Sequence, residues 1–136
     1  MNVKNTRISK TITSDQFKVN EAWIAIRINE LFLFARDQPY DIYVLMDAAS
    51  TYVFGSILSN VANVAPQEGE VEALFRKAWG TKRQWPDKLI TPKHSIVENV
   101  FRTLAEKNGF TFSTVPLSDL SSIVAPLKES FASAFR

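Results

Sequence analysis

The stretch Tyr40–Ser59, YDIYVLMDAASTYVFGSILS, decides how the rest of the chain can be arranged. In its first half, apolar and aromatic residues occupy both faces of an extended chain, which is typical of a strand covered on both sides. The small residues Asp47–Ser50 predict a tight turn, and Thr51–Leu58 is rich in residues that favour a returning strand. Asp47 is therefore expected to accept backbone hydrogen bonds, and Gly55 to mark a bulge or a close contact.

Upstream of this hairpin, residues 21–36 admit two interpretations. The Ile content and the alternation of Trp23–Ile28 favour a strand. The Ala, Leu and Glu content of the whole segment also suits a helix that ends before Gln38–Pro39. We prefer the strand. Residues 1–20 are polar and carry several basic side chains, so we expect them to form a loosely held arm, or a basic arm that touches phosphate, before a single domain over 21–136.

Downstream of the hairpin, the hydrophobic period lengthens from two residues to three or four, which indicates helices. Together with short extended segments between them, these helices predict a mixed α/β sheet. It has an antiparallel hairpin at the front and a parallel βαβαβ arrangement behind, with helices packed on it. The expected strands are Leu89–Thr91 and Phe110–Val115. The expected helices are one that begins at Glu68 and is stopped by Gly80, one that begins after Ser95, and Leu117–Phe135, which Pro126 should split or kink.

Composition excludes several kinds of site. The 136 residues contain no Cys and one His, which rules out disulfides, zinc-thiolate sites, a Cys nucleophile and His clusters. Four Gly argue against a Gly-rich nucleotide loop, and we predict no cofactor. His94 is expected to be an ordinary surface residue. The sequence has neither a signal-peptide core nor the ~18 apolar residues of a membrane helix, so we expect a cytoplasmic protein.

The predicted order of elements resembles the ribonuclease-H-like fold, and within it the catalytic core of retroviral-type integrases and transposases. Three segments within 23–116 carry the resemblance: Trp23, the hairpin VLMDAASTYVFG, and PDKLITP followed by a helix and GFTFSTVP. The C-terminal half, through PDKLI, the helix, a Gly and LSDL, is also similar to an uncharacterised family of bacterial domains. That second likeness implies no activity.

The integrase resemblance implies a two-metal site held by three carboxylates. It places the first at Ile26, the second at Pro92 and the third near Lys128–Glu129, so two of the three expected acids are replaced. Asp47 lies at the wrong end of the sheet for such a site. A rearranged site made of Asp37, Asp41 and Glu129 is conceivable; the alternative is that all three are solvated surface acids.

Basic residues gather between Arg76 and His94, although the net charge is only +2. Trp79 and Trp85 flank the basic loop, and cations interleaved with aromatic rings suit contact with nucleic acid. The alternative is a solvated loop, with both Trp rings packed against the core. The candidate nucleic-acid-binding residues are Lys82, Arg83, Trp85, Lys88 and Lys93, the last at the opposite end of a short strand.

The sequence therefore predicts a ribonuclease-H-like domain without the metal triad, and leans against an enzyme. We expect it to act as an interaction module or a nucleic-acid-associated module, with a nucleic acid or protein partner, no membrane, and possible self-association as a homodimer. The alternative is a metal-dependent nuclease or strand transferase with a rearranged carboxylate site.

Overall fold

The predicted hairpin forms in the computed structural model, which describes residues 11–29, 33–35, 37–63, 66–93, 95 and 97–134. Strand β3 (Gln38–Asp47) returns antiparallel as β4 (Val53–Asn60). Leu45 pairs with Gly55 and Met46 with Val53, so β4 carries one extra residue between these two pairs. This is a β-bulge, and it confirms the bulge that Gly55 predicted.

Residues 21–36 contain two strands and no helix in their described part. Strand β1 (Ala22–Arg27) and strand β2 (Leu33–Ala35) both pair antiparallel with β3. The pairing of β1 uses residues 43–47 of β3, and that of β2 uses residues 38–40. The preference for a strand is therefore confirmed, and the segment forms two strands that both pair with β3.

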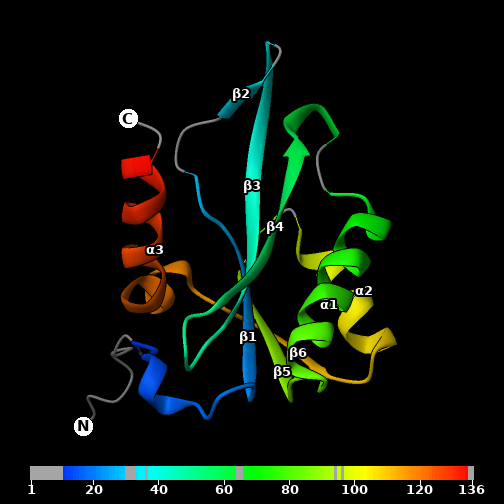
Figure 1. The fold of residues 1–136 in the computed structure, drawn as a ribbon, viewed down its shortest axis with the longest axis vertical. Coiled ribbons are helices and arrows are strands. Elements are labelled where there is room, and N and C mark those ends of the chain that lie inside the picture. Colours follow the sequence, from blue (N-terminus) through cyan, green and yellow to red (C-terminus); the bar gives the residue numbers. More distant parts are fainter. Residues whose placement is uncertain are drawn as a thin grey trace, which may run out of the picture.

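The parallel half of the sheet also forms as predicted. Strand β5 (Lys88–Pro92) pairs parallel with β1, and β6 (Thr111–Val115) pairs parallel with β5. The result is a six-stranded mixed sheet, antiparallel on the β3 side and parallel on the β5 side (Figure 1).

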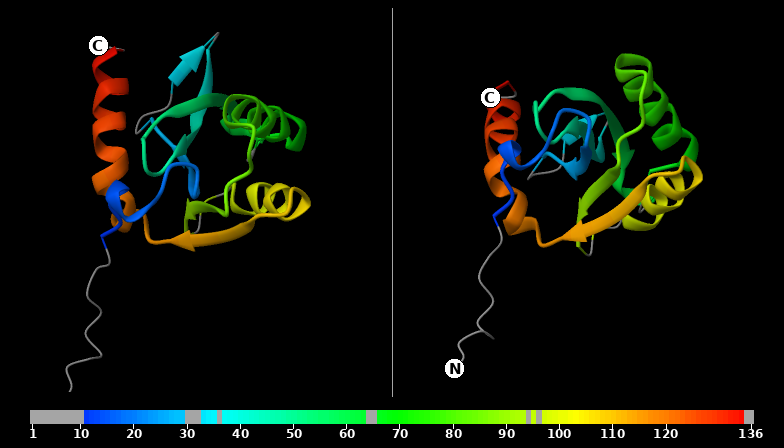
Figure 2. Two further views of the ribbon diagram at one scale, coloured as in Figure 1. Left: turned by 60° about the horizontal axis from the view of Figure 1, so that its bottom comes forward. Right: turned by 90° about the horizontal axis from the view of Figure 1, so that it is seen from below.

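Helices cover both faces of this sheet. Helices α1 (Glu68–Lys82) and α2 (Glu98–Lys107) lie on one face, and α3 (Ser121–Ala134) lies on the other (Figure 2). Helix α1 runs past Gly80, where we expected it to end, and is closed by Arg83 in the left-handed conformation. Helix α3 continues through Pro126, so of the predicted split or kink the split is wrong, and the kink stays a prediction. No helix in the described part of the chain is long and apolar enough to cross a lipid bilayer.

Each face has its own core because the side chains of β1 alternate. Trp23 and Ala25 join the core under α1 and α2, whereas Ile24 and Ile26 join the core under α3. Trp23 is fully buried at the centre of a ring cluster whose other members are Phe54, Phe75, Trp85 and Phe110, with ring centroids 5.0–6.4 Å from its own.

Residues 11–20, which we placed in a loosely held arm, pack against the domain. The Ile12 N–H donates to the Asp119 carbonyl at 2.8 Å, and the Ser122 hydroxyl donates to the Ile12 carbonyl at 3.3 Å. Ile12 and Phe17 are partly buried against the core beneath α3. Residues 1–10 of the predicted arm lie outside the described residues.

Asp47 has the turn role that the sequence predicts, and it is fully buried. Its carboxylate accepts hydrogen bonds from the Ser50 N–H at 2.8 Å and the Ser50 hydroxyl at 2.7 Å. It also accepts one from the N–H of Asn20, at 2.7 Å. The Asn20 side-chain oxygen in turn accepts from the Trp23 indole N–H at 2.7 Å. The turn, the start of β1 and the central ring are thus joined in one network.

We expect Asp47→Asn to lower the free energy of unfolding by about 2–3 kcal/mol, since an amide presents donors to groups that themselves donate. Urea unfolding followed by circular dichroism measures the change. The matched control is Asp87→Asn, because the Asp87 side chain is exposed. An equal loss in both variants would contradict a special role for the buried carboxylate.

Gly55 brings β4 close to α1. A methyl group at this position would lie 2.9 Å from Leu74 Cδ1 and 3.3 Å from Lys77 Cδ. We expect Gly55→Ala to destabilise the domain by about 1–2 kcal/mol through overpacking. Gly80→Ala is the control: nothing lies within 4 Å of its added methyl, and it should stabilise α1 by about 0.5–1 kcal/mol. Thermal unfolding measures both variants: the melting temperature should fall in Gly55→Ala and rise in Gly80→Ala.

Candidate functional site

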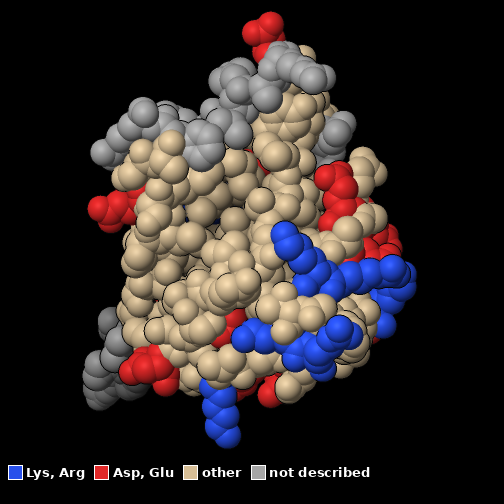
Figure 3. Space-filling model, viewed as in Figure 1, with Lys and Arg blue, Asp and Glu red and all other residues tan. Residues whose placement is uncertain are grey.

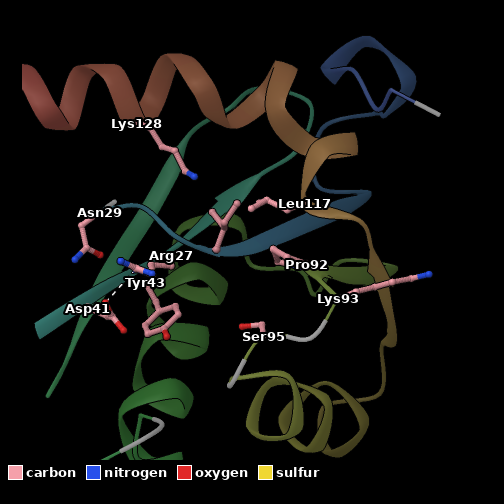
Figure 4. Close-up of a pocket in the computed structure, with 10 residues that line it drawn as sticks. Arg27, Asn29, Asp41, Tyr43, Pro92, Lys93, Ser95, Leu117 and Lys128 are labelled. Atoms are coloured by element: carbon pink, nitrogen blue, oxygen red, sulfur yellow. Dashed lines mark ion pairs between the residues drawn. The ribbon is translucent and has the colours of Figure 1, made fainter. Parts of the chain in front are cut away.

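A pocket of about 500 Å³ opens where β1 and β5 end. Figure 4 shows it between α3 on one side and the segment after β5 on the other. Parallel strands β1 and β5 bring their carboxyl ends to the same edge of the sheet. The apolar part of the pocket wall comes from Ile26, Tyr43, Pro92 and Leu117. Ile26 and Pro92 are the positions to which the resemblance assigned the first two metal ligands, so the pocket lies at that expected site.

Among the described residues, an ion pair joins Arg27 and Asp41 in this pocket. The Nε of Arg27 lies 3.0 Å from Oδ1 of Asp41. The Arg27 side chain is 39% exposed and that of Asp41 is 9% exposed, so the acid is enclosed while part of the Arg27 side chain reaches solvent. Asp41 is thereby neutralised within the pocket.

Tyr43 lies beside this ion pair, because it is the residue of β3 that pairs with Arg27 of β1 (Figure 4). Its pKa is raised to about 12, first by burial and second by the nearby Asp41 carboxylate, while the charge of Arg27 acts in the opposite direction. The hydroxyl therefore stays protonated at neutral pH, as a neutral donor at the pocket.

Asn29 fixes the wall of the pocket just beyond β1. Its side-chain oxygen accepts a hydrogen bond from the Ile42 N–H at 2.8 Å, and its amide donates to the Tyr40 carbonyl at 3.1 Å. Asn29 is buried, so these bonds hold the end of β1 against β3 and position Arg27. The sequence pattern did not single out Asn29, because a side chain that completes a sheet ladder has no signature in one sequence.

Two lysines complete the pocket. Lys128 reaches from α3 toward the strands, while the Lys93 side chain lies at the rim and is directed away from Tyr43 (Figure 4). Among the described residues that line the pocket, the charged groups are thus Arg27, Lys93 and Lys128 and the acid Asp41. Such an arrangement suits an anion. It does not resemble a set of ligands for a divalent cation, which needs several anionic oxygens.

The acids of the predicted rearranged site do not come together. Asp37 is exposed in the turn between β2 and β3, with a left-handed backbone (φ 62°). Glu129 is exposed on α3, and Asp41 is paired with Arg27. Within the described residues, no group of three or more His, Cys, Asp or Glu side chains is placed to hold a metal ion. His94 lies outside the described residues.

The basic segment lies at the other end of β5. Lys82 ends α1, Arg83 is exposed at its cap, and Lys88 begins β5, whereas Lys93 follows the end of that strand. Figure 3 shows several Lys and Arg side chains on the side of the molecule where α1 lies. The predicted binding residues are therefore spread over three places: Lys82 and Arg83 at the end of α1, Lys88 at the start of β5 and against Phe17, and Lys93 after the end of that strand.

The aromatic rings of this segment pack against other side chains of the domain. The Trp85 ring stacks on Phe110 at 5.6 Å and lies 6.4 Å from the Trp79 ring. The Arg83 guanidinium lies over Trp79 at 5.2 Å, and the Lys88 amine over Phe17 at 5.6 Å. Both Trp side chains are half-buried, as in the alternative that packs them against the core.

Comparisons with known proteins find the same fold. The chain matches the integrase catalytic core domain of HTLV-2 in complex with magnesium, in its dimeric form, with a TM-score of 0.57 and 14% identity. The match covers 85% of this chain and 69% of that one. The trimeric form of that core gives a TM-score of 0.57 and 14% identity over 84% and 68% of the two chains.

A chain of the simian T-cell lymphotropic virus intasome, in complex with PP2A regulatory subunit B56 gamma, matches with a TM-score of 0.55 and 14% identity. This match covers 98% of our chain but 46% of the viral one. No protein-family model and no curated protein matches the sequence. At this identity the likeness concerns the fold alone: the chain has the ribonuclease-H-like fold of retroviral integrase cores, and the predicted resemblance is confirmed. The likeness to bacterial domains stays a prediction.

The raised pKa of Tyr43 makes stability depend on pH at the alkaline end. An unfolded tyrosine ionises near pH 10, so unfolding releases a proton between about pH 10 and 12. The free energy of unfolding should therefore fall as pH rises through this window, by about 2–3 kcal/mol from this group. Urea titrations across the window measure it. In Tyr43→Phe, the free energy of unfolding should decrease less between about pH 10 and 12, because the contribution of this group is removed. In Tyr52→Phe, where the side chain is 53% exposed, the decrease should be the same as in the unsubstituted protein.

Proposed function

We propose that this chain, with the ribonuclease-H-like fold of integrase cores, is a non-catalytic module that associates with nucleic acid. One observation carries the proposal: the pocket at the carboxyl ends of β1 and β5 presents Ile26 and Pro92 where two-metal chemistry needs carboxylates. Ile26 is 2% exposed and apolar, and proline carries no charge. The acid that does line the pocket, Asp41, is paired with Arg27.

The proposed contact with nucleic acid uses the cations near the start of β5. In the described part of the chain, no ion pair joins Lys82, Arg83 or Lys88 to a carboxylate, so these residues supply positive charge. Phosphate contacts of this kind supply affinity with little sequence preference. Because Trp85 stacks on Phe110, we propose that its role is to support the loop and that the cations make the contact.

The partner and the state of assembly belong to the same proposal. The HTLV-2 cores are described in dimeric and trimeric forms, and the intasome chain in a complex with a protein. These states support the prediction that this chain also self-associates or meets a protein partner. We retain the prediction of a cytoplasmic location.

One experiment tests both parts of the proposal. Labelled single-stranded and duplex DNA and RNA are incubated with the protein in Mg²⁺ or Mn²⁺, and cleavage and fluorescence anisotropy are followed in the same samples. We expect binding without cleavage. In duplex DNA, Lys82→Gln with Arg83→Gln should lower the magnitude of the salt slope by about 2, the value for two lost phosphate contacts.

The control pair is Arg76→Gln with Lys107→Gln, which removes the same charge from cations that already contact Glu72. It should change the salt slope little. Metal-dependent cleavage would establish the alternative, a nuclease with a rearranged site. Binding that is equally weakened by both pairs would overturn the assignment to the start of β5.

A further inference from the structure

Strand β4 forms one edge of the sheet. It pairs with β3 on one side, and in the described part of the chain no strand lies along its other side. In Figure 1, β4 lies at the front of the sheet, with α1 to one side of it and α3 to the other. The outer edge of β4 is therefore open to another strand.

The backbone groups on this outer edge belong to Ser56 and Leu58. In β3, the N–H and the C=O of Ile42 both bond to the two residues that follow β1. Successive residues of a strand alternate in this direction, so Tyr43 turns to β4 and bonds there with its partner Ile57. The residues on either side of Ile57 therefore point their N–H and C=O groups away from β3.

The sequence of this edge favours pairing with another strand. None of residues 48–67 is charged, whereas 22% of the whole chain is. Lysine or proline on an edge strand opposes such pairing, and β4 contains neither. Its bulge lies at the Val53 end and leaves residues 55–60 in regular register, with Leu58 52% exposed. Figure 3, drawn from the same side as Figure 1, shows that much of the surface between α3 and α1 is free of charged side chains.

Helix α1 flanks this edge and carries charges of both signs along it. A methyl group at Gly55 would lie 3.4 Å from the Lys77 amine, so this lysine lies beside β4. Glu70 lies about two helical turns nearer the start of α1, on the same side of the helix. Both side chains are exposed. A second copy related by a two-fold axis reverses the direction of α1, so Glu70 of each copy lies toward Lys77 of the other. The charges along this surface are therefore complementary to those of its own copy.

We propose that β4 pairs antiparallel with β4 of a second copy of this chain, across a two-fold axis at Ile57. Ser56 of each copy then lies opposite Leu58 of the other, and each of these pairs exchanges two N–H···O=C hydrogen bonds. The exposed Leu58 side chains of the two copies lie on the same face near the axis and lose contact with water. The inference rests on the self-association in the proposed function and names the surface that carries it.

The test is analytical ultracentrifugation of the full chain from micromolar to millimolar concentration. We expect an equilibrium between monomer and dimer without larger species, because a two-fold pair uses the free edge of β4 in both copies. Leu58→Lys should raise the dissociation constant of the dimer about tenfold or more, since it brings like charges together across the axis. The matched control is Leu117→Lys, which adds the same charge at a leucine 49% exposed beyond the end of β6 and should leave the constant unchanged.

A second variant, Ser56→Pro, tests the backbone pairing itself. The N–H that it removes points away from β3, and edge strands tolerate proline at such positions, so the domain should fold while the dimer weakens. Circular dichroism establishes that each variant is folded. Amide hydrogen exchange followed by NMR then locates the interface. The Leu58 N–H should become protected as the concentration rises, whereas the Ile57 N–H, which bonds to β3, should be protected at every concentration.

The possible results separate this interface from the proposed function. A dimer that both Leu58→Lys and Ser56→Pro leave intact overturns the interface, and self-association stands. A chain that stays monomeric at every concentration overturns both, and the edge of β4 is then open to a strand of another protein. An unlimited series of larger oligomers overturns the two-fold pair. Binding of nucleic acid through Lys82 and Arg83 is measured by its own salt slope, so none of these results decides it.

Discussion

The buried carboxylate of Asp47 is the constraint on which the rest of the domain depends. A charged group with no exposure is tolerable only when hydrogen bonds surround it, and here the donors come from Ser50 and Asn20. Asn20 adopts a left-handed backbone (φ 67°), and its side chain also donates to the Gln84 carbonyl at 3.3 Å. One acid therefore sets the hairpin turn, the start of β1 and the loop before β5. The orientation of Trp23 follows, because its indole N–H has its partner in that network.

Much of this fold could be predicted from one sequence because its strongest signals are local. Period-two alternation and a turn of small residues identify the hairpin, and the change of period identifies α1 and α2. The errors arise where packing overrides local preference. Helix α3 continues through Pro126 because Ile123, Val124 and Leu127 pack against the sheet on both sides of the proline. Helix α1 continues for two residues past Gly80, to Lys82, and Arg83 supplies its left-handed cap.

The candidate site could be predicted only as an absence. The resemblance identified Ile26 and Pro92 as replacements for acids, and both line the pocket. Which other side chains line the pocket depends on how α3 crosses the sheet, and one sequence does not contain that information. The register of α3 directs Lys128 toward the strands and leaves Glu129 exposed, so a lysine lines the pocket in place of the acid that we considered. Lys128 carries a positive charge where Glu129 carries a negative one, so it favours an anion and not a metal ion.

The ring cluster around Trp23 also determines how this protein can be observed. All three tryptophans belong to one cluster, with Trp23 and Trp79 each within 6.4 Å of Trp85 between ring centroids. Because the three rings lie this close together, their emission reports on one region of the protein, near the start of β5. Tryptophan fluorescence will therefore report mainly on the end of the sheet that contains Asp47, and little on the opposite end. The pocket beside Tyr43 lies at the opposite end of β1 and β5 from these rings, so a constant tryptophan spectrum would not show that the pocket is empty.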